Sequence, residues 1–384
     1  MGVSQRNKGG ASTKIDPVGA SKKDDDQTTT PSKGQEVSWH LIISLVLLGV
    51  LAGFFAGCLF GLYVVRPAWT EMVPKWRLDF KCSVIHILGD STVAAGNFEM
   101  TSLPYGVDFN GSKPTGRFSN GYTIGDYSAI ENHSPIPQAY RSLGEERKSD
   151  FGINFASAGC GIMDVTRPPS RFFTCASMSE QMKQLLSLDL DLSESVVFIS
   201  VGGNDYLFSF KGKAAENPKG FAKVLVRHLM RNLMSLYTRG VRKFLINNIG
   251  PVGCIPNKRK RTSTTNSTTH ACDKDLNKAI TMYNALLHLE LKELPKEATI
   301  VMANSHELFT GIFKDPAKYG FNVTEDRCCG TWDADNNMYR CNEESGYCDD
   351  REHTLFFDGA HTTDKANKVF AHKCFAGSIC HQIL

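Results

Sequence analysis

Short apolar runs rich in β-branched residues alternate with longer segments of helical period from residue 82 onward. Runs of four to eight such residues are typical of buried strands, and apolar residues recurring every three or four positions are typical of amphipathic helices. Their alternation predicts an α/β fold with a mainly parallel five-stranded sheet covered on both faces. The expected strands are residues 83–88, 152–157, 195–201, 243–249 and 299–303, and the expected helices are residues 177–188, 218–239 and 273–294.

The longest apolar segment, residues 41–65, lies nearer the amino terminus. It contains twenty-five residues without a charge, and about 20 apolar residues suffice to cross a bilayer. A cleaved secretory signal would place a shorter apolar core near the start of the chain. Here a polar tail of about forty residues precedes the segment, and Arg66-Pro67 follows it. The pattern favours a retained transmembrane signal anchor at residues 39–65, followed by a stem at residues 66–81.

Residues 1–38 are rich in Lys, Asp, Ser, Thr and Gly and almost lack aliphatic side chains, so we expect a disordered tail. Within the apolar segment a glycine recurs every four residues, which puts all of these glycines on one helix face and lets another backbone approach closely. Two interpretations stay open, namely tolerance of glycine in a single-pass helix and a homodimer through this face. The four glycines are Gly49, Gly53, Gly57 and Gly61.

Sequons and cysteines indicate the side of the membrane on which the larger part of the chain lies, which local counts of Lys and Arg do not decide. Eleven of the twelve cysteines follow the apolar segment, and disulfides form in the secretory lumen. Asn-X-Ser/Thr sequons are also useful only there. We therefore expect a type II membrane protein with a cytosolic tail and a lumenal domain at residues 82–384. The sequons are at Asn110, Asn132, Asn266 and Asn322.

The cysteines after the membrane segment are odd in number, so at least one thiol is left over unless it pairs with another chain. A polar, basic insert between Cys254 and Cys272 is expected to be a surface loop closed by a disulfide. Further along the chain, four cysteines could bind zinc instead of forming disulfides. Two of them are adjacent and so lack the two-residue spacing of zinc knuckles, and we therefore favour disulfides. The cysteines of that alternative site are Cys328, Cys329, Cys341 and Cys348.

Composition excludes some classes of partner. Hydrophobic residues make up 41% of the chain and charged residues 22%, as in an ordinary globular protein with an added apolar segment. The formal net charge of +3 is too small to favour binding to nucleic acid. We predict neither a nucleic-acid partner nor a metal or other cofactor.

Four polar clusters lie at the carboxyl ends of expected strands or after the last expected helix. In a parallel α/β sheet, ligands bind outside the carboxyl ends of the strands. These positions are therefore where chemistry is expected. The clusters are GDST at residues 89–92, ASAGCG at 156–161, GGND at 202–205 and DGAH at 358–361.

The clusters contain the groups that ester hydrolysis requires. A serine hydroxyl is a weak nucleophile that needs a base, and the base needs an orienting group. Asp358 and His361 stand three residues apart, so on one helical turn the carboxylate can hold one imidazole nitrogen while the other faces Ser91. The imidazole, with an ordinary pKa of about 6.5, can accept a proton at neutral pH. The N–H groups of Ser91 and Gly159 and the Asn204 amide could stabilise an oxyanion.

These clusters, in this order, resemble the GDSL or SGNH hydrolases, and specifically the plant-type GDSL esterase/lipase family. The resemblance runs from about residue 82 to residue 375 and includes GRFSNG at residues 116–121, the block at 152–161 and FDGAH at 357–361. It implies a three-layer α/β/α, flavodoxin-like sandwich. It also implies roles for five residues: Ser91 as nucleophile, His361 as base, Asp358 as its orienting acid, and Ser91, Gly159 and Asn204 as the oxyanion hole.

Two residues depart from the family pattern. Thr92 replaces the usual Leu after the serine, and Cys160 stands where the family often has Ala or Gly. We expect Cys160 to be a small buried residue and the unpaired thiol. Asp205 is an alternative orienting acid with a less suitable spacing from the histidine. Arg117 and Asn120 are expected to organise their glycine-rich loop rather than to touch substrate. On its own, the serine would be better explained as a helix cap, and the other clusters are what favour catalysis.

The family includes lipases, esterases, acyltransferases and deacetylases of cell-wall polysaccharides, so the motifs leave the substrate open. A membrane anchor favours a Golgi serine esterase that removes O-acetyl groups from a polysaccharide such as xylan, which passes through the same lumen. The plasma membrane and the endoplasmic reticulum are alternative locations. One rival hypothesis is a lipid esterase or acyltransferase that acts on long acyl chains. The other is a non-catalytic, membrane-held binding protein on a hydrolase-like fold.

Overall fold

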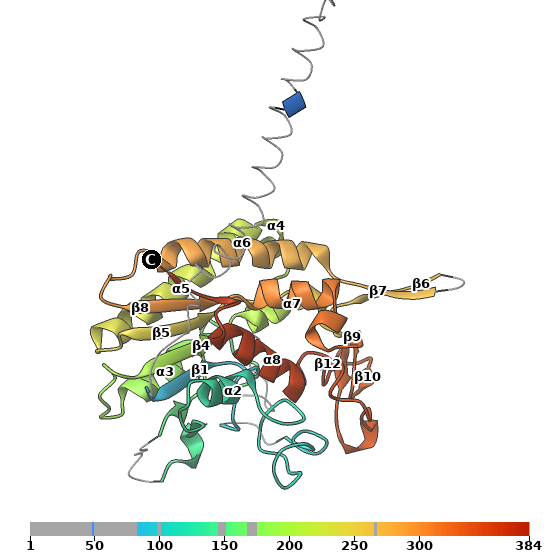
Figure 1. Cartoon of the computed structure of the whole chain (residues 1–384), viewed down its shortest axis with the longest axis horizontal. Helices are drawn as coiled ribbons and strands as arrows, with labels where there is room; N and C mark the ends of the chain where they lie inside the picture. The colour runs from blue at the N-terminus through green and yellow to red at the C-terminus, as the bar shows by residue number, and fades with distance from the viewer. Residues whose placement is uncertain are drawn as a thin grey trace, which may run out of the picture. The chain divides into compact units, whose positions relative to one another are not determined.

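The computed structural model describes residues 48–49, 83–97, 101–144, 151–166, 175–264 and 267–383 (Figure 1). Within these ranges no helix is both long enough and apolar enough to cross a bilayer. Of the predicted membrane segment and its glycine face, only Leu48 and Gly49 belong to the described residues. The expected tail and stem, with the remaining three glycines, lie outside them.

One sheet of seven strands forms the centre of the fold, in the order β13-β8-β5-β4-β1-β3-β2. Neighbouring strands are parallel, except that β13 runs antiparallel to β8. The strands are β1 (Ile85–Gly89), β2 (Gln138–Ala139), β3 (Ile153–Asn154), β4 (Val196–Ser200), β5 (Lys243–Asn247), β8 (Thr299–Ala303) and β13 (Cys380–Ile383).

The five predicted strands correspond to β1, β3, β4, β5 and β8, so the expectation of five strands omitted the two edges of the sheet. Strand β2 has only two residues, and β13 exposes its two central residues, His381 and Gln382. Neither therefore has the continuous apolar run by which a strand buried on both faces is recognised.

Helices α3, α5 and α6 are the three predicted ones, and side-chain caps fix where they begin. Ser177 forms a capping box with Glu180 at the start of α3, and Asp273 accepts a hydrogen bond from the Leu276 N–H at the start of α6. The helices are α2 (Ile124–Glu131), α3 (Met178–Leu186), α4 (Lys213–Glu216), α5 (Pro218–Thr238), α6 (Lys274–Leu291), α7 (Ser305–Lys314) and α8 (Asp364–Phe375).

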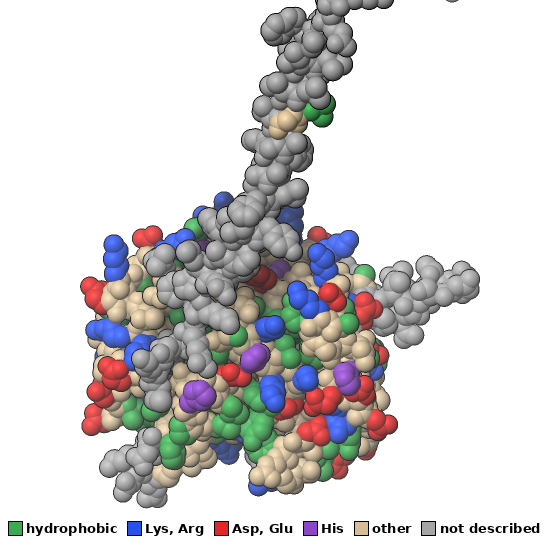
Figure 2. All heavy atoms as spheres, in the orientation of Figure 1, with side chains coloured by type: hydrophobic (Ala, Val, Ile, Leu, Met, Phe, Trp, Pro, Cys, Tyr) green, Lys and Arg blue, Asp and Glu red, His purple; other side chains and the backbone are tan. Residues whose placement is uncertain are grey.

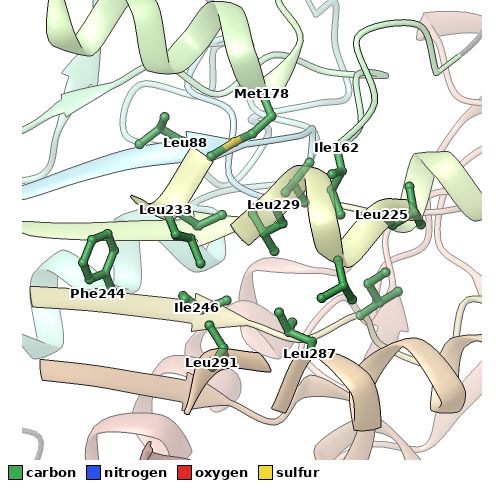
Figure 3. Close-up of a cluster of buried hydrophobic side chains, with 14 of the residues drawn as sticks. Leu88, Ile162, Met178, Leu225, Leu229, Leu233, Phe244, Ile246, Leu287 and Leu291 are labelled. Carbon is green, nitrogen blue, oxygen red and sulfur yellow. The ribbon is translucent and has the colours of Figure 1, made fainter. Parts of the chain in front are cut away.

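The helices cover both faces of the sheet and give three layers. Residues of α3, α5 and α6 share one hydrophobic core with the sheet, and residues of α2, α7 and α8 share another. Figure 3 shows the first core, in which Leu229 and Leu233 of α5, Ile246 of β5 and Leu287 of α6 belong to one cluster of buried side chains. Full burial of such a side chain stabilises the fold by about 1.5–3 kcal/mol. The fold is therefore the expected α/β/α sandwich.

Shorter elements lie outside the sandwich. The insert between Cys254 and Cys272 is closed by a disulfide as predicted, but it contains an antiparallel hairpin of β6 and β7 rather than a plain loop. These elements are β6 (Lys260–Thr264), β7 (Ser267–Ala271), β9 (Val323–Arg327), β10 (Thr331–Asp333), β11 (Met338–Arg340), β12 (Thr354–Phe356) and the short helices η1 (Tyr140–Ser142), η2 (Asp205–Ser209), η3 (Val252–Cys254), η4 (Ala317–Tyr319) and η5 (Glu343–Ser345).

Five disulfides connect ten of the eleven cysteines that follow the apolar segment, and the eleventh, Cys82, lies outside the described residues. The four cysteines of the alternative zinc site pair as two disulfides, as favoured above. The disulfides are Cys160–Cys175, Cys254–Cys272, Cys328–Cys348, Cys329–Cys341 and Cys374–Cys380.

The expectation that Cys160 is the unpaired thiol is wrong. The chain returns beside residue 160 just before α3 begins, because the N–H of Ala176 donates to the Ser157 hydroxyl and that of Met178 to the Gly161 carbonyl. This return brings Cys175 within bonding distance of Cys160. Sequence spacing alone gives no sign of such a return.

The surface carries interspersed charges, and Figure 2 shows Lys and Arg side chains mixed with Asp and Glu on the face in view. Among the sequons, Asn110 and Asn322 are exposed, whereas Asn266 lies outside the described residues. Asn132 is 5% exposed and its amide donates to the Ser83 carbonyl at 3.0 Å. Asn132 is therefore a poor acceptor for a glycan, because its amide nitrogen is already used inside the fold.

We expect the chain, expressed in a eukaryotic secretory pathway, to carry glycans on Asn110 and Asn322 and none on Asn132. A glycan on the buried amide would remove its hydrogen bond and could not be accommodated. Glycopeptide mass spectrometry of the purified protein measures occupancy at each site. Substantial occupancy at Asn132 in the folded protein would contradict the buried position.

Candidate active site

Ser91 lies just beyond the carboxyl end of β1, at the edge of the sheet where ligands bind in parallel α/β folds. The N–H of Asp90 donates to the Ser200 carbonyl at the end of β4, and the N–H of Val93 donates back to the Asp90 carbonyl. Residues 91–93 form a single turn, and no helix begins there. Ser91 is thus not a helix cap, and its hydroxyl is directed at His361.

His361 and Asp358 lie in the turn between β12 and α8. The Nε2 atom of His361 is 2.7 Å from the Ser91 Oγ atom, and its Nδ1 atom is 2.7 Å from Asp358 Oδ2. One helical turn is expected here from the sequence, but residues 358–361 do not form one. Instead, the N–H groups of Ala360 and His361 both donate to Asp358 Oδ1 at 2.7 Å, a side-chain turn that produces the same contact between residues three apart.

Tyr105 was not anticipated from the sequence, because nothing in a local pattern links it to a residue 253 positions later. Its hydroxyl donates to Asp358 Oδ2 at 2.5 Å. The Tyr105 ring packs edge to face against Phe118 and Phe357, and the Phe118 ring lies 5.0 Å from the His361 ring. Tyr105 therefore positions the carboxylate, while Phe118 supports the imidazole.

The surroundings move the two pKa values in opposite directions. Burial alone would raise the pKa of Asp358, but His361 and the hydrogen bonds from Tyr105 and the backbone outweigh it, so this pKa lies below its ordinary value. Burial alone would lower the pKa of His361, but Asp358, aided by Asp90, outweighs it, so this pKa lies above its ordinary value. The carboxylate thus stays ionised and makes the imidazole a stronger base.

The departure at Thr92 has a structural role. Both the N–H and the hydroxyl of Thr92 donate to Asp90 Oδ1, at 3.0 and 2.7 Å. Burial raises the pKa of Asp90, and these two hydrogen bonds counteract that rise. The Thr92 hydroxyl also lies 3.2 Å from the Ser200 hydroxyl, which accepts a hydrogen bond from the Asn247 amide. A leucine would keep the backbone hydrogen bond to Asp90 but could make neither of the hydroxyl contacts.

Gly159 and Asn204 lie on the loops that follow β3 and β4. Gly159 has φ +75°, a left-handed conformation that glycine adopts without strain. One N–H of the Asn204 side chain donates to the Cys160 carbonyl at 2.8 Å, which joins the two loops. The backbone N–H groups of Ser91 and Gly159 have no acceptor within the part of the chain that the structure describes. These two donors are free for an oxyanion.

Asp205 supports the same loop and does not contact His361. Its carboxylate accepts hydrogen bonds from the Ile162 N–H at 2.8 Å and the Met163 N–H at 3.2 Å. Burial, partly offset by these hydrogen bonds, raises the pKa of Asp205 to about 6. Asp358, and not Asp205, is therefore the carboxylate beside the imidazole.

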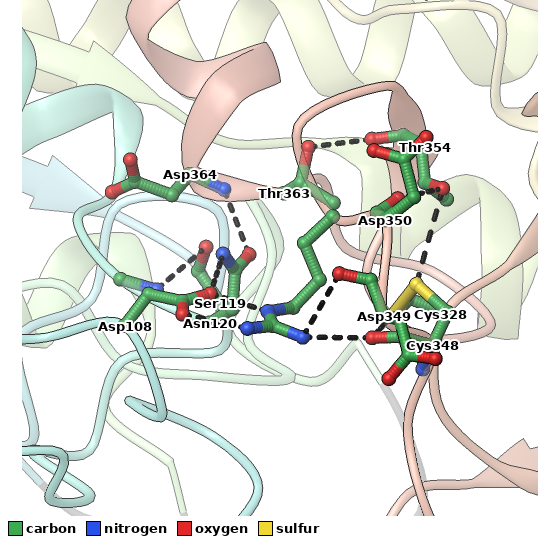
Figure 4. A network of polar contacts seen from close by, with 12 residues as sticks. Asp108, Ser119, Asn120, Cys328, Cys348, Asp349, Asp350, Thr354, Thr363 and Asp364 are labelled. Carbon is green, nitrogen blue, oxygen red and sulfur yellow. Dashed lines mark hydrogen bonds and ion pairs between the residues drawn. A yellow bond between two sulfur atoms is a disulfide. The ribbon is translucent and has the colours of Figure 1, made fainter. Parts of the chain in front are cut away.

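Arg117 and Asn120 organise their loop, as the sequence predicts. The Arg117 guanidinium forms two hydrogen bonds of 2.8 and 2.7 Å with Asp126 of α2. The Asn120 amide donates to Asp108 and accepts from the Asp364 N–H at the start of α8 (Figure 4). The loop that supplies Tyr105 and Phe118 is thereby fixed to both helices.

A cavity of about 130 Å³ lies beside His361 at the carboxyl edge of the sheet. An apolar cavity of comparable size, about 150 Å³, is large enough to hold benzene. The lining of this one combines apolar and hydroxyl or amide groups. Its apolar side chains include Ile249, Val252, Ile255, Phe309, Phe313 and Phe356, and its polar ones include Thr92, Ser200, Asn247 and Ser305.

Known proteins resemble the chain over most of its length. The Arabidopsis thaliana protein GDSL esterase/lipase At5g55050 is 32% identical over 320 residues, which cover 74% of this chain and 83% of that protein. GDSL esterase/lipase At2g23540 of the same plant is 31% identical over 370 residues, covering 82% and 94%. Among solved structures, Est24, a carbohydrate acetylesterase from Sinorhizobium meliloti, matches with a TM-score of 0.34 at 13% identity, covering 76% of this chain and 96% of that one. That likeness is too slight to inform on fold or function.

The family-level comparison is broader. A family model described as GDSL-like lipase/acylhydrolase matches residues 85–374, which include the serine, aspartate and histidine of the site. The two plant relatives are both named GDSL esterase/lipase, and the match covers most of each of them. The chain therefore belongs to the GDSL-like lipase/acylhydrolase family and is a carboxylic ester hydrolase.

Proposed function

We propose that the chain is a serine esterase in which Ser91 attacks the carbonyl carbon of the ester. The observation that carries this proposal is the continuous contact from Ser91 through His361 to Asp358, with 2.7 Å at each step. His361 takes the hydroxyl proton as the bond from Oγ to carbon forms, and Asp358 stabilises the resulting imidazolium. The imidazolium then protonates the leaving alkoxide as the ester bond breaks, which leaves an acyl-serine.

Hydrolysis of the acyl-serine repeats the same proton transfers with water. His361 takes a proton from the water as its oxygen attacks the acyl carbon, and returns that proton to the Ser91 oxygen as the acid departs. In both steps the negative carbonyl oxygen is stabilised by the N–H groups of Ser91 and Gly159 and by the second N–H of the Asn204 amide. Loss of one such donor typically lowers turnover by about 10²–10³.

We propose an O-acetyl group on a cell-wall polysaccharide such as xylan as the bond that is cleaved. The cavity beside His361, about 130 Å³, has room for a short acyl group such as acetyl, which is consistent with this proposal. The five disulfides suit an oxidising secretory compartment. A signal anchor at residues 39–65 would hold the enzyme in the Golgi lumen, where nascent polysaccharide passes. A homodimer through the anchor glycines remains part of this proposal.

Replacement of the proposed nucleophile tests the mechanism directly. We expect Ser91→Ala to lower kcat on 4-nitrophenyl acetate by at least about 10³-fold, since the residual rate comes only from the oxyanion donors and binding. Ser187→Ala, an exposed serine at the end of α3, should keep the full rate. Activity that survives in Ser91→Ala would overturn the mechanism, and a wild-type chain inactive on all esters would favour a binding protein.

The pH dependence follows from the raised pKa of His361. Only the neutral imidazole can accept the serine proton, so kcat/KM should fall as the pH falls through a value above 6.5. Asp358→Asn removes the main group that raises this pKa. We therefore expect the acidic limb of that variant to move to lower pH, with a maximal rate reduced by about 10⁴-fold. The measurement is a pH profile of kcat/KM.

A matched control for this profile is Glu131→Gln, which removes a carboxylate paired with a different histidine, His372. Its acidic limb should coincide with that of the wild-type chain. An acidic limb of Asp358→Asn at the same or a higher pH would contradict the proposed coupling between carboxylate and imidazole.

Acyl-chain length separates a short-chain esterase from a lipid esterase. We expect nitrophenyl acetate and butyrate to be hydrolysed with similar kcat/KM, and the hexadecanoate about 10²-fold more slowly, because overfilling the cavity costs about 1–3 kcal/mol. Val252→Phe, which fills part of the cavity, should lower kcat/KM for butyrate about tenfold and leave acetate within about twofold. A wild-type preference for the hexadecanoate would overturn the deacetylase proposal.

A further inference from the structure

Residues 326–352, here called the cysteine lobe, present an aromatic pair to solvent. Strands β10 and β11 form an antiparallel hairpin in which Trp332 lies directly opposite Tyr339. The two rings meet edge to face with their centroids 5.0 Å apart. The Arg327 guanidinium carbon lies 3.4 Å from the centre of the Tyr339 ring. Trp332 remains 49% exposed, a large apolar surface that the protein itself does not cover.

Two disulfides make this hairpin rigid. Cys329–Cys341 links the residues that flank the hairpin, and Cys328–Cys348, drawn in Figure 4, closes the lobe around it. A side chain that is already fixed loses little conformational entropy when a ligand binds. Arg327, Tyr339 and Trp332 are packed against one another in this rigid hairpin. Their arrangement therefore suits the binding of a ligand.

One side of the lobe is joined to the strand that leads into the active site. The N–H of Cys328 donates to the Phe356 carbonyl at 3.0 Å, and the N–H of Cys329 donates to the Phe357 carbonyl at 2.6 Å. These carbonyls belong to the two residues immediately before Asp358. The base of the hairpin thus lies against the segment that positions the proposed triad carboxylate.

The hairpin itself is joined to the turn that carries His361. The Tyr339 N–H donates to the Asn257 side-chain carbonyl at 2.8 Å, and the Asn257 N–H donates to the Gly359 carbonyl at 2.8 Å. Gly359 stands between Asp358 and His361, and a Cβ atom there would lie 2.2 Å from the Asn257 carbonyl oxygen. The aromatic pair is therefore two hydrogen bonds away from the site of hydrolysis.

The charge of the lobe restricts what it can bind. Residues 326–352 contain eight carboxylates and three guanidinium groups, and no lysine. This negative field repels polyanions such as nucleic acids and acidic polysaccharides. A neutral polymer meets no such repulsion.

We propose that Trp332 is the sugar-stacking residue of a subsite that binds a neutral polysaccharide chain next to the scissile ester. A pyranose ring has an apolar face of C–H groups that packs on an aromatic ring. This inference rests on the proposed polysaccharide esterase activity and identifies how the polymer is held. Trp332 touches the polymer at a distance from the reacting bond, so it affects binding and not the chemical step.

The test compares a polymer with a small ester, using the full-length chain in detergent. We expect Trp332→Ala to raise KM for neutral acetylated xylan about tenfold with little change in kcat, and to leave kcat/KM for 4-nitrophenyl acetate within about twofold. Trp332→Phe should recover part of the affinity, because it restores an aromatic face. Phe151→Ala is the matched control, since Phe151 is 50% exposed and precedes the amino end of β3, whereas the site lies at the carboxyl ends of the strands. This variant should behave like wild type on both substrates.

Several outcomes would overturn the subsite. Equal KM values for wild type and Trp332→Ala on the polymer would do so, as would a parallel loss on both substrates, which indicates a structural role. Affinity electrophoresis in gels containing neutral xylan gives an independent reading, in which wild type should be retarded and Trp332→Ala should not. A wild-type chain that is retarded but releases no acetate would support the subsite and refute the proposed deacetylation. A chain that releases acetate with no retardation and no effect of Trp332→Ala would refute the subsite alone.

Discussion

The Asp358 carboxylate, ionised and 4% exposed, is the constraint on which the arrangement of the site depends. Removing a charged group from water costs several kcal/mol unless hydrogen bonds and an opposite charge compensate it. Four donors converge on this group: the Tyr105 hydroxyl, the His361 ring, and the N–H groups of residues 360 and 361. Three of these donors come from the turn at residues 360 and 361, and the fourth comes from Tyr105, far away in the sequence. The same compensation that makes the burial tolerable also gives the imidazole its direction and its raised proton affinity.

The parallel sheet supplies the other half of the site. Strands β1, β3 and β4 are neighbours, so the loops after them, which carry Ser91, Gly159 and Asn204, emerge at one edge. Hydrogen bonds between the loops then fix their relative position. The Asn204 amide donates to the Cys160 carbonyl, and the Asp205 carboxylate accepts from the N–H groups of Ile162 and Met163. The triad carboxylate and imidazole come from outside this layer, from the turn before α8. Attack on an ester therefore depends on the docking of one turn onto an otherwise ordinary sheet edge.

The sequence predicts those parts of the structure that have a local signal. The five central strands have continuous apolar runs, and α3, α5 and α6 have apolar stripes with capping residues in front of them. Helix α2 escaped prediction because it buries Gly125, Asp126 and Ser128, so it has no apolar stripe. The three triad residues were recognisable because the clusters are short and ordered. Tyr105, Asn257 and the Cys160–Cys175 disulfide were not, since their partners are chosen by the way the chain returns in space.

The hairpin of β10 and β11 is attached to the turn of His361 through its backbone and Asn257, while several of its side chains, among them Trp332, are exposed. Its residues can therefore change without moving the groups that break the bond. The Cys329–Cys341 bond closes this segment at its base, so a substitution between the two cysteines leaves the anchoring of the hairpin intact. The binding surface and the reacting groups are therefore independent parts of the same fold.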